Sequence, residues 1–121
     1  MKNISDYLSE SLNIPTPKDW SMFTVKQIVG LIKQIVHSQK KQGTSYSDFY
    51  AGITKDVHSN MIRHGNKEYV VLADCGSREK AGKVESDLEN EKFYVGKKAD
   101  NGGDEKSSII YVIYMDKNFK Q

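Results

Sequence analysis

The clearest hydrophobic pattern in the chain is an amphipathic helix over residues 24–41. Thr24 and Gln27 form a capping box, in which each side chain can bond the backbone amide of the other residue. Apolar residues then recur at helical spacing on one face, at Val25, Ile28, Val29, Ile32, Ile35 and Val36. The lysines of this segment lie mostly off the stripe. They form either an ordinary solvated face or a face that contacts phosphate groups.

Three further apolar runs predict the strands of a small sheet. They cover residues 45–54, 68–74 and 108–115. The last run is apolar at nearly every position, which is typical of a central strand that is buried on both faces. Residues 97–106, which are polar and glycine-containing, predict a loop before it. Near the N-terminus, residues 4–12 predict a short amphipathic helix, and Trp20 is expected to anchor the following connector against the core.

Two short helices carry polar residues on their apolar faces. The first covers residues 57–64, with Asp56 as its N-cap and Gly65 as the residue that ends it. The i, i+3, i+4, i+7 spacing defines its inward face, which holds Val57, Asn60, Met61 and His64. A histidine is therefore expected on the inner side of this helix, close to the tyrosine of the preceding strand.

The second such helix begins after Ser77, which is a suitable N-cap. Its apolar stripe holds Ala81, Val84 and Leu88, and Glu85 follows the same stripe. An unpaired carboxylate in a protein interior costs several kcal/mol, so it needs a partner or a proton. Glu85 is therefore either paired to a lysine at the edge of the stripe or directed inward as a functional group.

Composition restricts the kind of protein that these elements can build. The 121 residues suffice for one domain, and a hydrophobic content of 37% with a net charge of +2 predicts a soluble globular protein. This charge is too small to indicate nucleic-acid binding by itself. A single cysteine, Cys75, excludes an internal disulfide and a cysteine-built zinc site. Because neither a membrane span nor a secretion signal is recognisable, we expect a cytoplasmic protein with no membrane partner.

Tyr50, His64 and Glu85 are the candidate catalytic residues, because packing alone does not explain their positions. Glutamate is the hard oxygen ligand that a magnesium-like ion prefers, and such an ion can polarise a phosphodiester. A tyrosine or a histidine with a tuned pKa can deprotonate the attacking water. A nearby cation would stabilise the charge on the transferring phosphate. Metal-dependent phosphodiester cleavage is therefore one candidate chemistry.

Residues 50–54, with the sequence YAGIT, resemble the second motif of the GIY-YIG nuclease family, a Y-x-G sequence followed by a small polar turn. His64 falls at the histidine that ends the next helix in many members, and residues 81–88 resemble the later helix whose glutamate binds the divalent metal. The resemblance implies an α/β (α+β) fold with a small three-stranded, mainly antiparallel sheet flanked by helices. It also implies that Glu85 binds Mg²⁺ or Mn²⁺.

The sequence departs from the family pattern in two ways. No GIY triplet precedes Tyr50 at the usual hairpin distance. The family arginine lies about one turn before the histidine, where this chain has Ser59 and Asn60, so Arg63 is the available catalytic cation. These departures favour a GIY-YIG-like module with lost or reduced nuclease activity that binds nucleic acid or protein. The alternative is an active DNA endonuclease that depends on a divalent metal.

The resemblance also divides the chain. Residues 1–43 are predicted to be an N-terminal helical extension, 44–116 the GIY-YIG-like core and 117–121 a tail. DNA is the candidate partner of the core, and the N-terminal helices are a candidate surface for a protein partner.

Overall fold

The computed structural model describes residues 14–41, 44–65, 68–96 and 107–120. The predicted helix at 4–12 and the predicted loop at 97–106 lie outside these ranges. The described elements follow in the order β1 (Lys18–Asp19), α2 (Val25–Gln39), the 3₁₀-helix η1 (Tyr46–Asp48), β2 (Phe49–Thr54), α3 (Val57–Arg63), β3 (Val71–Asp74), α4 (Arg78–Asn90), β4 (Tyr94–Val95) and β5 (Ile109–Tyr114). None of the described helices is both long and apolar enough to cross a membrane.

The strands form one mixed sheet in the order β1-β3-β5-β2-β4. β5 pairs antiparallel with both β3 and β2, whereas β1 runs parallel to β3 and β4 runs parallel to β2. The predicted small α/β class is confirmed, but the three-stranded, mainly antiparallel sheet is wrong. The two additional strands lie at the edges and have two residues each, which is too short to produce a recognisable period of alternation.

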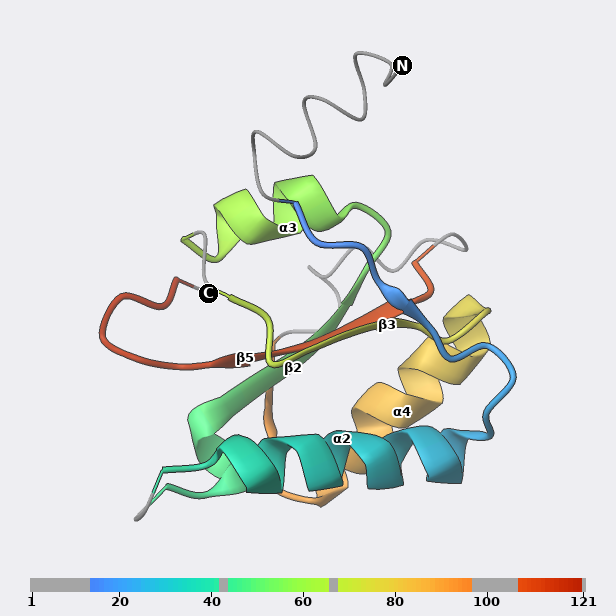
Figure 1. Ribbon diagram of the computed structural model, residues 1–121, viewed down its shortest axis with the longest axis horizontal. Coiled ribbons are helices and arrows are strands. Elements are labelled where there is room, and N and C mark those ends of the chain that lie inside the picture. The colour runs from blue at the N-terminus through green and yellow to red at the C-terminus, as the bar shows by residue number, and fades with distance from the viewer. Residues whose placement is uncertain (1–13, 42–43, 66–67, 97–106, 121) are drawn as a thin grey trace.

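The helices cover the two faces of the sheet unequally (Figure 1). α2 and α4 lie together on one face, and α3 lies on the other. The predicted capping box at the start of α2 is confirmed, because Thr24 Oγ1 accepts from the Gln27 amide at 3.1 Å and Gln27 Oε1 accepts from the Thr24 amide at 2.9 Å. The predicted N-caps Asp56 and Ser77 also accept hydrogen bonds from the first turns of α3 and α4.

Alternation along the strands divides the buried residues into two cores. The helix-pair core lies between the sheet and helices α2 and α4, and includes Ile28, Ile32, Val36, Ala51, Val84, Leu88, Ile110 and Val112. The aromatic core lies on the α3 side, and consists of Tyr50, Leu72, Tyr111 and Ile113, with Val57, Tyr69 and Phe119 partly buried against them. Residues that precede position 44 therefore contribute to the sheet through β1 and to the helix-pair core through α2.

Candidate functional site

Tyr50 lies at the centre of the aromatic core and has no exposed surface. It faces α3 because side chains alternate along β2, and its neighbour Ala51 faces the helix pair. The centroid of its ring lies 5.1 Å from that of His64, 5.3 Å from that of Phe119 and 6.0 Å from that of Tyr111. The hydroxyl of Tyr50 is therefore out of contact with the bulk water from which an attacking nucleophile would be drawn.

His64 is the C-cap residue of α3 and is also fully buried. Its Nδ1 lies 2.6 Å from the carbonyl oxygen of Lys120, and its Nε2 lies 2.8 Å from the hydroxyl oxygen of Tyr111. A carbonyl oxygen can only accept, so Nδ1 carries the proton and Nε2 of the neutral ring accepts from Tyr111. Burial is the largest influence on the pKa of His64 and lowers it. The hydrogen bond to Lys120 raises this pKa, and the charge of Arg63 lowers it further.

Gly52 provides the space that Tyr111 occupies. The two residues are partners in the antiparallel pairing of β2 and β5. A Cβ atom at position 52 would lie 2.5 Å from the hydroxyl oxygen of Tyr111 and 2.6 Å from its Cζ, which is too close for either atom to stay in place. The glycine of the YAGIT motif therefore has a packing role. It allows the Tyr111 ring to lie across β2 and its hydroxyl to reach His64.

Asn60 and Tyr69 extend this hydrogen-bonded group. The Tyr69 hydroxyl donates to Asn60 Oδ1 at 2.8 Å, and Asn60, on α3, is only 5% exposed. Burial is the largest influence on the pKa values of Tyr69 and Tyr111 and raises both. A hydrogen bond with Asn60 lowers the pKa of Tyr111 and so opposes the effect of burial. Both phenols therefore stay protonated at neutral pH and serve as hydrogen-bond donors.

Glu85 lies on α4, and Figure 1 shows α4 and α3 on opposite faces of the sheet. Tyr50 and His64 belong to the aromatic core on the α3 side. Its side chain is only 3% exposed, in agreement with its position on the same stripe as Val84 and Leu88. The structure therefore brings Tyr50 and His64 together in the aromatic core, and it does not bring Glu85 to them.

A metal site usually shows itself as a cluster of ligand side chains. Mg²⁺ and similar ions are bound through oxygen ligands that surround the ion. In the ranges that the structure describes, no group of three or more His, Cys, Asp or Glu side chains is placed to hold an ion. The neighbours of Glu85 on the buried stripe of α4, Val84 and Leu88, are apolar. Metal binding by Glu85 stays a prediction from the resemblance.

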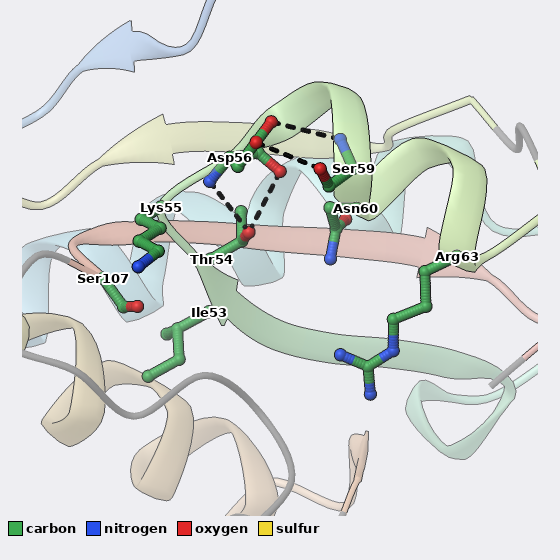
Figure 2. A pocket seen from close by; sticks show the side chains of 8 residues that line it. All are labelled: Ile53, Thr54, Lys55, Asp56, Ser59, Asn60, Arg63 and Ser107. Carbon is green, nitrogen blue, oxygen red and sulfur yellow. Dashed lines mark hydrogen bonds between the residues drawn. The ribbon is translucent and has the colours of Figure 1, made fainter.

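A pocket of about 250 Å³ lies beside α3, where β2 ends (Figure 2). Lys55 and Arg63 lie on opposite sides of this pocket, and Asn60 lies between them. Arg63, the predicted catalytic cation, is therefore part of the pocket wall. Neither Tyr50 nor His64 lines it.

Asp56, the acidic residue of the pocket wall, is the N-cap of α3, and its carboxylate accepts hydrogen bonds from the first turn of this helix. Its Oδ1 accepts from the Ser59 amide at 3.1 Å, and its Oδ2 accepts from the Ser59 hydroxyl at 3.0 Å. These hydrogen bonds lower the pKa of Asp56, so the carboxylate stays ionised. Among the described residues of the pocket wall, two carry a positive charge, Lys55 and Arg63, and one carries a carboxylate, Asp56.

Several of these residues carry little signal in the sequence. Helical spacing correctly predicts an inward Asn60, but its position as a link between Tyr69 and Tyr111 has no local signal. Tyr111 is predicted only as part of a central strand, and its relation to Gly52 depends on strand register. The pattern that indicates this contact is a tyrosine opposite a glycine on neighbouring strands.

No family model, no curated protein and no solved structure matches this chain. The relationship to the GIY-YIG family therefore rests on short motifs alone and stays a prediction. The fold and the site define a small α/β domain with an aromatic, hydrogen-bonded core on one face of its sheet and a cationic pocket beside it.

Proposed function

We propose that the chain is a GIY-YIG-like domain that binds DNA without cleaving it, through the cationic pocket beside α3. One observation carries this proposal. Tyr50 and His64 have no exposed surface, and they lie across the sheet from Glu85. Cleavage would require the group that activates water and the metal ligand to reach the same phosphodiester. Their separation supports binding without cleavage.

The pocket supports the choice of DNA as the ligand. The guanidinium group of Arg63 can bind two phosphate oxygens at once, and the ammonium group of Lys55 adds a compact charge. Both residues are exposed, so a ligand as large as a nucleic acid can reach them. Phosphate contacts of this kind also predict a clear dependence of affinity on salt.

The test of cleavage uses the full chain with supercoiled plasmid DNA and either Mg²⁺ or Mn²⁺. We expect no nicking beyond that of a Glu85→Ala variant, because Glu85 is buried away from the pocket. Metal-dependent nicking that Glu85→Ala abolishes would overturn the proposal and favour the active endonuclease.

The test of binding measures the fluorescence anisotropy of labelled duplex DNA at increasing salt. The double variant Lys55→Gln/Arg63→Gln should bind more weakly, and its log–log salt slope should be shallower by about 0.9 for each phosphate contact that is lost. The control is Lys83→Gln/Arg78→Gln, which makes the same charge change on α4. Equal losses in both double variants would exclude the pocket as the binding site, because net charge alone would then explain the result.

A further inference from the structure

A second pocket, of about 190 Å³, lies on the helix-pair side of the sheet, where the end of α2 meets the start of β2 and the end of β5. Its apolar part consists of Phe49, Val70 and Tyr114, which all pack in or against the helix-pair core. Its polar part consists of Gln39, the last residue of α2, and Lys41. The described walls of this pocket and of the pocket beside α3 share no residue, so a ligand bound here occupies a separate site.

The apolar part of the pocket is formed mainly by two aromatic rings. Phe49 and Tyr114 are partners in the antiparallel pairing of β2 and β5, and their ring centroids lie 5.4 Å apart at an interplanar angle of 58°. Val70 is fixed by the hydrogen bond from its amide to the Val112 carbonyl oxygen, at 2.8 Å. Because aromatic rings form favourable tilted or offset contacts with one another, this surface favours an aromatic ligand.

The size of the pocket restricts this ligand to a small molecule. A dry cavity of about 150 Å³ with an apolar lining holds one benzene molecule. The pocket of about 190 Å³ therefore has room for one ring of that size and a small polar group. The polar group belongs at one end of the ligand, because both polar residues of the described wall come from the end of α2.

Charge favours an acid as this polar group. Among the described residues of the wall, Lys41 alone carries a charge, and the charge is positive. Within the described ranges, the ammonium group of Lys41 and the side-chain amide of Gln39 take part in no hydrogen bond or ion pair. The backbone of Lys41 is fixed, because its carbonyl oxygen accepts from the amide and the hydroxyl of Thr44 at 3.1 Å and 2.7 Å. One ammonium group matches a singly charged carboxylate better than a phosphate monoester, whose charge is about −1.5 to −2.

We infer that this pocket binds a small aromatic acid, with its ring against Phe49 and Tyr114 and its carboxylate beside Lys41. The side-chain amide of Gln39 donates to the same carboxylate. Because Lys41 is exposed, the ion pair stays partly hydrated, so it adds selectivity for an acid while the apolar contact supplies most of the affinity. The inference does not depend on the proposed function, which concerns other residues.

The experiment compares phenylacetate with phenylacetamide, which has the same ring and no charge. Each compound is titrated into the full chain, and NMR spectra give its affinity and its nuclear Overhauser contacts. We expect contacts between the ring of the ligand and the rings of Phe49 and Tyr114. Phenylacetate should bind about three- to fivefold more tightly than phenylacetamide, in the upper part of the range for exposed ion pairs.

The variant Lys41→Gln separates the ion pair from the apolar contact. It should weaken phenylacetate binding about three- to fivefold and leave the affinity for phenylacetamide unchanged. The control is Lys26→Gln, which removes an exposed lysine near the other end of α2 and should change neither affinity.

Three outcomes would overturn the acid site. The first is equal affinity of the natural chain for the two compounds, and the second is an equal effect of Lys26→Gln and Lys41→Gln. The third is the absence of contacts between the ligand and the rings of Phe49 and Tyr114. The DNA-binding measurement tests Lys55 and Arg63, so the proposed function succeeds or fails separately.

Discussion

The two faces of the sheet are stabilised in different ways. On the helix-pair side, aliphatic residues such as Ile32, Leu88 and Val112 are removed from water, and their contribution grows with buried area. On the α3 side, Tyr111 and His64 are buried together with polar atoms that must keep their hydrogen-bond partners. Substitutions on the two faces should therefore destabilise the protein for different reasons, through lost apolar volume on the helix-pair side and through lost hydrogen-bond partners on the α3 side.

Truncation of Leu88 should cause the largest loss of stability. Leu88 is fully buried under the sheet, so Leu88→Ala removes apolar contacts and leaves a cavity, which costs about 2–5 kcal/mol of the free energy of unfolding. Urea denaturation followed by circular dichroism measures this value. The control is Leu31→Ala on α2, where the leucine is only partly buried and the loss should be less than half as large. Equal losses would contradict the expectation that the cost of truncation in the helix-pair core follows the burial of the side chain.

A methyl group at position 52 should cause the next largest loss of stability, because it overpacks the aromatic core. Gly52→Ala places a Cβ atom against the Tyr111 ring, and we expect about 1–3 kcal/mol of destabilisation. The same substitution made in a Tyr111→Ala background should add little further cost, because the clashing ring is gone. A cost that persists in that background would contradict the packing role assigned to Gly52.

Loss of a single hydroxyl distinguishes the two faces most directly. Tyr111→Phe keeps the ring but removes the proton that His64 Nε2 accepts, and a buried acceptor without its partner costs about 1–3 kcal/mol. Tyr114→Phe makes the same chemical change on a partly buried residue of the helix-pair side and should cost clearly less. Similar costs in the two variants would mean that the hydrogen bond to His64 contributes nothing specific.

The elements on the helix-pair side could be predicted from local sequence. The stripe of α2, its capping box and the stripe of α4 each depend on residues within a few turns, and the structure has all three. The edge strands β1 and β4 could not be predicted, because two residues produce no periodic pattern. The predicted sheet was therefore too small and lacked its parallel pairs.

The site on the α3 side could be predicted only in part, for a related reason. The inward positions of Asn60 and His64 follow from helical spacing. Their partners come from distant parts of the chain: Tyr111 is 47 residues from His64, and Lys120 is 56 residues from it. Which strand neighbours which, and on which face each helix packs, decides these contacts. The same information separates Glu85 from Tyr50, although both are buried.

The pH dependence of stability should be the smallest and most selective difference between the faces. Burial lowers the pKa of His64 below its ordinary value of 6.5, so the unfolded chain takes up a proton at a higher pH than the folded protein does. The free energy of unfolding should therefore be fully present above about pH 6.5 and should fall as the pH drops below it, by at most about 1.4 kcal/mol per pH unit for one group. Asp19 and Asp56 also have lowered pKa values, but they titrate below the ordinary aspartate value of 3.8 and act at more acidic pH.

Urea denaturation between about pH 5 and pH 7.5 should show this slope in the natural chain and in His58→Gln, an exposed substitution on the same helix. In His64→Gln the slope should be lost, because the group that titrates in the aromatic core is gone. A slope that survives in His64→Gln would place the titrating group elsewhere in the protein.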